Sequence, residues 1–182
     1  MVTGKSRFTM SLAAVLALIV MLFARVTVPI QAADGVTVEV DTVLDSDAAA
    51  YQACTAAAGD CSLRGAVSLA NTDTGRDYVI TLPAGTYQLG IAPDASPDDN
   101  ADGDLDVLGS VTIQGAGAAL TLIQAGADQS SGLDRLVDVV GSSADLTLRD
   151  LTLRYGRASG GSGGAVRNAG TLLLENVTVA ES

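Results

Sequence analysis

The sequence predicts an all-β fold, a parallel β-helix closed at its N-terminal end by a short helix. The first observation is an internal repeat: Leu146–Gly156 (LTLRDLTLRYG) returns as Leu172–Ser182 (LLLENVTVAES). A fixed period of this size is typical of solenoids. The second is apolar alternation on both sides of a polar position, Asp150 or Asn176, which predicts two short strands meeting at a corner. No helical pattern separates the copies, so we expect stacked windings of strands. The aligned apolar pairs are Leu146/Leu172, Leu148/Leu174, Leu151/Val177 and Leu153/Val179.

The first 32 residues are expected to be a secretory signal peptide. Lys5 and Arg7 precede the uncharged apolar run Ser11–Ala24, and small residues follow, with cleavage expected after Ala32. The alternative is an uncleaved membrane anchor, but the run is shorter than the roughly 20 residues that a span needs. We therefore expect an exported chain without a stable membrane span once the signal is removed.

Composition excludes several classes of function. Loss of residues 1–32 removes three basic residues and no acidic one, so the formal charge changes from −11 to −14. Such an acidic surface repels nucleic acid and anionic lipid. The chain has no histidine, which excludes imidazole catalysis and histidine metal sites. After the signal, its only aromatic residues are four tyrosines, so platforms for stacking sugars are few.

The two cysteines, Cys54 and Cys61, lie close together in the sequence. In an exported chain such an even pair predicts a disulfide. Two thiolates without histidine are too few for a structural zinc site.

Two elements are expected before the windings, in an N-terminal cap of residues 33–75 that precedes the strands of 76–182. Val36–Val40 alternates and predicts a strand. Ser62–Asn71 predicts a short helix, with Ser62 as the N-cap and Asn71 as the stop. Its apolar face would cover the first open winding. That face consists of Leu63, Ala66, Val67 and Ala70.

Cys61–Ala66 (CSLRGA) resembles the CSLREA motif of exported bacterial proteins with right-handed β-helix repeats. Gly163–Asn168 (GGAVRN) is similar to the GGA-[IV] element of polymorphic outer-membrane-protein repeats. The resemblance covers Val36 to the C-terminus and implies a right-handed, pectin-lyase-like solenoid, secreted or at the cell surface. It implies no chemistry. Other segments that fit are Ile80–Leu89, Gly103–Val107, Val111–Gly117 and Gly132–Val139.

The chain departs from the motif at Gly65, where the family has glutamate. The capping residues are thus Ser62, Leu63, Arg64, Gly65 and Ala66. A glutamate there would reach back to the N-cap amide and complete a capping box. The sequence therefore predicts that Gly65→Glu raises stability by about 1 kcal/mol.

The windings begin with two strands in Asp77–Leu89, divided by a turn at Pro83–Gly85, with inward positions at Ile80, Leu82, Tyr87 and Leu89. Further strands are expected in Leu105–Ile113, Leu120–Ile123 and Leu136–Val140. The sequence stops directly after a repeat, which predicts a short or truncated solenoid, or a last winding that pairs with another chain.

Asp98–Asp106 (DDNADGDLD) is a candidate calcium loop. Its spacing follows the first nine positions of an oxygen-ligand loop, with Gly103 at the turn, but Gly109 stands where a bidentate glutamate belongs. The alternative, which we favour, is an acidic loop leading into a strand. Calcium is thus the only candidate cofactor. The candidate ligands are Asp98, Asn100, Asp102 and Asp106, with Asp104 at the seventh position.

The sequence assigns no catalytic residue. Asp134, Arg135 and Asp138 lie close together, and Asp150 and Arg154 fit one strand face, but all have ordinary structural explanations. We therefore expect an exported structural or adhesion module, bound to an extracellular polysaccharide or a cell-surface protein and to no nucleic acid. The alternatives are a carbohydrate-active domain and a calcium-dependent binding module.

Overall fold

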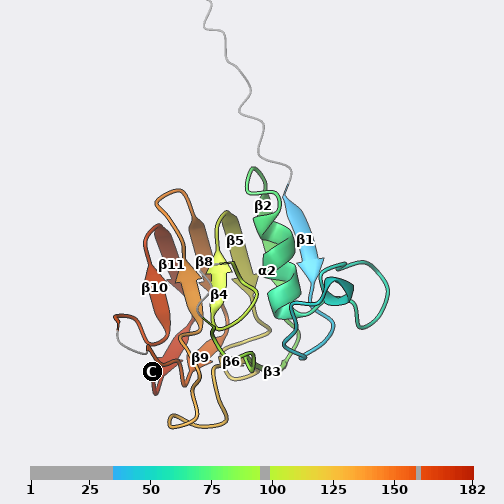
Figure 1. The fold of residues 1–182 in the computed structure, drawn as a ribbon. Coiled ribbons are helices and arrows are strands. Elements are labelled where there is room, and N and C mark those ends of the chain that lie inside the picture. The colour runs from blue at the N-terminus through green and yellow to red at the C-terminus, as the bar shows by residue number, and fades with distance from the viewer. Residues whose placement is uncertain (1–34, 95–98, 159–160) are drawn as a thin grey trace, which may run out of the picture. The chain divides into compact units, whose positions relative to one another are not determined.

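The computed structural model describes residues 35–94, 99–158 and 161–182, and these form twelve strands, one α-helix and one 3-10 helix (Figure 1). The expected signal peptide and Asp98 lie outside the described residues. Every pairing between named strands is parallel, which confirms an all-β fold of parallel sheets. The strands are β1 (Val36–Glu39), β2 (Asp77–Thr81), β3 (Gly85–Gln88), β4 (Leu105–Val107), β5 (Ser110–Gln114), β6 (Thr121–Gln124), β7 (Val137–Val139), β8 (Asp145–Arg149), β9 (Thr152–Arg154), β10 (Val166–Asn168), β11 (Thr171–Glu175) and β12 (Thr178–Ala180).

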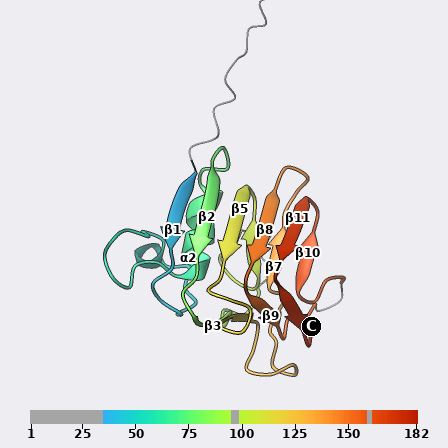
Figure 2. The same ribbon diagram turned by 180° about the vertical axis from the view of Figure 1, so that it is seen from behind.

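The strands form three sheets, which the chain visits in a constant order. The five-stranded sheet has the order β1-β2-β5-β8-β11, the four-stranded sheet β3-β6-β9-β12, and the three-stranded sheet β4-β7-β10. From β2 onward, successive strands enter the five-stranded, the four-stranded and then the three-stranded sheet before the order repeats. In both ribbon views β1 lies at one end of the stack and β10 and β11 at the other (Figures 1 and 2).

The two copies of the internal repeat form neighbouring parallel strands in two of the sheets. Leu146 pairs with Leu172 in the register of β8 and β11, and Thr152 pairs with Thr178 in that of β9 and β12. The corner residues Asp150 and Asn176 have left-handed backbones, with φ of 52° and 54°, which aspartate and asparagine tolerate well. The Nδ2 of Asn176 donates to Oδ1 of Asp150 at 3.1 Å. The polar position in each copy therefore forms a ladder along one corner.

The core consists of aliphatic side chains from successive windings. The inward positions expected in the first winding, Ile80, Leu82, Tyr87 and Leu89, are all buried. Leu148 is fully buried, but its partner Leu174 in the last strand of the same sheet is 44% exposed. The last strand of this sheet, β11, thus has the same row of apolar side chains, but this row is partly exposed to solvent.

The α-helix, α2 (Leu63–Asn71), lies against β2, β4 and β5. Its N-cap Ser62 accepts a hydrogen bond from the Gly65 amide at 2.9 Å, as N-cap serines do. The four apolar residues of its expected face are buried. The Cys54–Cys61 disulfide predicted from the sequence is confirmed just before the helix. In the part of the chain that the structure describes, no helix has the length and apolar character to cross a membrane.

The prediction for Gly65 is wrong, because the backbone of the 3-10 helix η1 (Ala49–Tyr51) fills the space next to it. A Cβ atom on Gly65 would lie 1.9 Å from the carbonyl oxygen of Tyr51 and 2.7 Å from its carbonyl carbon. The same carbonyl accepts the backbone hydrogen bond of Ser62 at 3.1 Å. Glycine is therefore required for close approach, and a glutamate has no room to complete a capping box.

Candidate functional site

Arg64, in the first turn of α2, is a fully buried cation. Its Nε and Nη2 donate to the two carboxylate oxygens of Asp45 at 2.7 and 3.2 Å. The Asp45 side chain is only 6% exposed, and its Oδ2 also accepts the amides of Gly90 and Ile91. Removing one partner of such a buried ion pair destabilises the fold, because the remaining charge is buried without compensation.

The same guanidinium organises the acidic loop that the sequence presented as a calcium candidate. Its Nη1 and Nη2 donate to four backbone carbonyl oxygens between residues 100 and 104, at 2.8–3.3 Å. These carbonyls belong to Asn100, Asp102, Gly103 and Asp104. The loop therefore wraps around an arginine side chain, and its backbone oxygens already have a cationic partner.

The side chains of Asn100 and Asp102 form hydrogen bonds with other parts of the chain. The Asn100 amide donates to the Arg64 carbonyl at 3.0 Å and to Ser68 Oγ at 2.7 Å, and its Oδ1 accepts the Asp106 amide. Asp102 accepts the amide of Asp94 at 3.1 Å. These two side chains therefore have partners within the chain, and the calcium loop stays a prediction.

The carboxylates of Asp104 and Asp106 lie close to a third carboxylate, that of Asp138. These carboxylates lie within 4.8 Å of one another and all three residues are buried. Asp106 on β4 and Asp138 on β7 are direct neighbours in the three-stranded sheet. Each is the middle residue of a similar triplet, LDV or VDV, whose outer residues enter the core. That shared triplet is the sequence signal from which this pairing could have been found.

Two arginines balance these carboxylates. Arg135 Nη1 lies 3.2 Å from Asp104 Oδ2 and 3.7 Å from Asp138 Oδ2. Arg167 on β10 is the register partner of Asp138 on the other side and forms an ion pair with it. We call Asp104, Asp106, Asp138, Arg135 and Arg167 the carboxylate–arginine cluster. Three carboxylates at this spacing are suitable oxygen ligands for a divalent cation, but the two guanidiniums already supply positive charge there.

Burial, and then the neighbouring charge of Asp134, raise the pKa of Asp104 to about 6, against the lowering effect of Arg135. Asp138 adds to the rise. A carboxyl with this pKa binds a proton more tightly in the folded chain than in the unfolded one, whose value is 3.8. Its protonation therefore stabilises the fold at low pH, and this contribution is lost as the pH rises through about 6.

We expect Asp104→Asn to remove this pH dependence. Between pH 4 and pH 7.5 the wild-type chain should lose about 2 kcal/mol of unfolding free energy through this one group. The neutral asparagine does not titrate, so the decrease over that range should be smaller by a similar amount. Urea unfolding at several pH values measures it. Asp47→Asn, at an exposed position, should keep the wild-type profile. A profile unchanged by Asp104→Asn would contradict the assignment.

The other acid–base candidates do not converge. Asp150 lies in the corner ladder, where Gln114 Nε2 donates to it at 2.6 Å. Arg154 donates through Nε and Nη2 to Gln124 Oε1 and lies over the ring of Tyr155, 4.8 Å from its centroid. Asp134 accepts the backbone amide of Arg135. These bonds are all structural and show no shared reaction centre.

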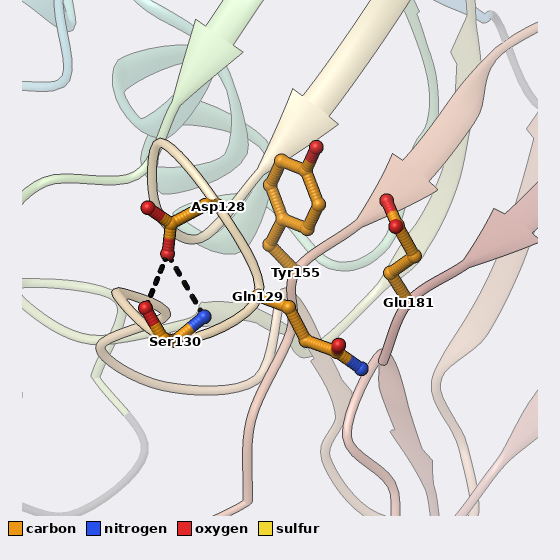
Figure 3. Close-up of a pocket in the computed structure, with 5 residues that line it drawn as sticks. All are labelled: Asp128, Gln129, Ser130, Tyr155 and Glu181. Atoms are coloured by element: carbon orange, nitrogen blue, oxygen red, sulfur yellow. Dashed lines mark hydrogen bonds between the residues drawn. The ribbon is translucent and has the colours of Figure 1, made fainter.

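A separate hollow lies beside the corner that follows β9. It is about 430 Å³ in volume, and the side chains around it are polar apart from one aromatic ring (Figure 3). The residues that line it are Asp128, Gln129, Ser130, Tyr155 and Glu181.

The fold and these contacts define a disulfide-containing protein of parallel sheets, with a buried arginine-organised loop and a carboxylate–arginine cluster on one sheet. Comparison with known proteins found no matching family model, no matching curated protein and no matching solved structure.

Proposed function

We propose that this chain is an exported structural or adhesion module of the cell surface, folded as a right-handed parallel β-helix. The observation that carries the proposal is the constant order in which the chain visits its three sheets. In-register windings of this kind make long sheet surfaces of fixed geometry, and repeat architectures use such surfaces for binding. The CSLRGA segment, which resembles a motif of exported proteins, points the same way.

Two further observations support export. The disulfide suits an oxidising compartment outside the cytosol. The formal charge of −14 for residues 33–182, which follows from the chain's −11, favours solubility and disfavours anionic membranes and nucleic acid. The residues ahead of the described part have the composition of a signal peptide.

The positions and ion pairs of the charged side chains favour a structural or adhesion module over an enzyme. A hydrolase or lyase needs two or three such groups that converge where a substrate reaches them. The three clustered carboxylates are buried, and the arginines beside Asp104 and Asp138 form ion pairs with them. These ion pairs link neighbouring strands of the three-stranded sheet, so catalysis is not required to explain these residues.

The test is expression of the full chain in a bacterial host that exports proteins. We expect the protein outside the cytosol with Ala33 as its first residue, determined by N-terminal sequencing. The exported product is then screened against immobilised extracellular polysaccharides and intact cell surfaces, with depolymerisation followed in the same wells. Binding without shortening of any polysaccharide is the expected result. A product retained in the cytosol, or shortened polysaccharide, would overturn the proposal.

A further inference from the structure

The hollow beside the corner after β9 continues into a second one. This second hollow has a volume of about 380 Å³ and shares Gln129 and Glu181 with the first. Arg157 also lines it. We call the two hollows together the corner groove. Figure 3 shows the Tyr155 ring between Asp128 on one side and Glu181 on the other, with Gln129 below it. The remaining lining residues are Gly156, Ala158, Gly164 and Ser182.

One wall of the groove is a loop with several internal hydrogen bonds. The Asp128 carboxylate accepts the amides of Ser130 and Ser131, each at 2.9 Å, and the hydroxyl of Ser130 at 2.7 Å. These bonds lower the pKa of Asp128 and tie residues 128–131 into a turn. Gln129 follows Asp128 at the tip of this loop, where it lines both hollows.

The floor and the opposite wall come from equivalent positions of the repeat. Tyr155 and Glu181 follow β9 and β12, and each has a left-handed backbone, with φ of 63° and 54°. This conformation is strained for a bulky side chain such as tyrosine, and such strain is common at ligand sites. The guanidinium of Arg154 lies over one face of the Tyr155 ring, which leaves the other face for a ligand.

The polar groups of the groove are available to a ligand. Among the described residues, the Gln129 amide, the Glu181 carboxylate, the Tyr155 hydroxyl and the Arg157 guanidinium make no hydrogen bond or ion pair within the chain. A groove with an aromatic ring and several unused polar groups fits a ligand with both an apolar face and hydroxyl groups.

We propose that the corner groove binds a neutral oligosaccharide. One C–H face of a pyranose ring would lie on Tyr155, while the Glu181 carboxylate and the Gln129 amide would bond its hydroxyls. The strongly acidic chain disfavours a polyanionic glycan such as a polyuronate. This inference rests on the proposed function and names the ligand class of the adhesion module.

The test is calorimetric titration of the exported protein with maltohexaose, cellohexaose and hexagalacturonate. We expect heat of binding with one of the two neutral sugars and none with the uronate. Tyr155→Ala should weaken that binding about tenfold or more, because it removes the stacking surface. Glu181→Gln should weaken it by a smaller factor. The matched control, Glu39→Gln on the exposed side of β1, should bind as the wild type does.

Each other result overturns a defined part of the inference. Undiminished neutral-sugar binding by Tyr155→Ala would overturn the site, and preference for hexagalacturonate would overturn the ligand class. Absence of heat with both neutral sugars would overturn the ligand proposal while cell-surface binding, measured on the same sample, keeps the adhesion module. Loss of both kinds of binding would end both proposals. Circular dichroism of each variant excludes misfolding as the cause.

Discussion

Arg64→Met is expected to lower the free energy of unfolding by about 3–5 kcal/mol. The methionine keeps much of the apolar stem but leaves the Asp45 carboxylate, 6% exposed, without its counter-charge. It also leaves four loop carbonyls without the guanidinium that binds them at 2.8–3.3 Å. Urea unfolding followed by circular dichroism measures the loss.

The matched control is Arg76→Met. Arg76 is half exposed, and its Nε lies 3.9 Å from Asp73, an ion pair worth less than about 1 kcal/mol. If both arginine variants lose the same stability, Arg64 has no special role. Hydrogen exchange gives a second readout, because the backbone amides of residues 99–106 should exchange faster in Arg64→Met and normally in Arg76→Met. Unchanged exchange there would contradict the arginine-organised loop even if stability falls.

Gly65→Glu is expected to destabilise the chain by about 2–3 kcal/mol, although the CSLREA motif, which Cys61–Ala66 resembles, has glutamate at this position. The reason is the 1.9 Å approach between a Cβ atom and the Tyr51 carbonyl oxygen, which forces η1 away from the start of α2. Gly65→Ala should lose a comparable amount, because the clash already involves the first side-chain atom. Thermal unfolding measures both.

Gly90→Ala is the control for this pair, since a Cβ on Gly90 meets no atom within 4 Å and its backbone is not left-handed. It should change the unfolding temperature little. A higher unfolding temperature for Gly65→Glu would mean that the capping box forms and that η1 does not occupy the place seen in the structure.

The repeat and the cap were accessible from the sequence because both depend on local patterns. Alternation at Leu146 and Leu148 predicts which side of a strand is apolar, and the polar positions Asp150 and Asn176 mark the corners. The three-stranded sheet was predicted only in part. The expected strand Leu136–Val140 contains β7, but the expected segment Leu105–Ile113 divides into β4 and β5 of two different sheets, and β10 was not predicted. Strands of three residues are too short to show a period.

The contacts of the charged residues, in contrast, could not be predicted from local patterns. The spacing of Asp98–Asp106 suggested oxygen ligands converging on a metal, because spacing describes only where residues lie along one loop. The partner of that loop, Arg64, is separated from it by at least 36 positions in the bonds that it makes, and Asp45, which binds this arginine, lies a further 19 positions back in the sequence. Local sequence contains no information on such contacts.

By itself, the sequence determined that this protein is a parallel, repetitive β-protein with a disulfide and an amphipathic helix ahead of its windings. Periodicity and residue type decide these features, because they act between near neighbours or recur at a fixed interval. Only the tertiary structure decided that a guanidinium lies within the acidic loop, that Gly65 permits a backbone contact, and that Asp104, Asp106 and Asp138 meet two arginines. Those outcomes depend on which distant segments the stacking of windings brings together, and packing and charge compensation become defined only there.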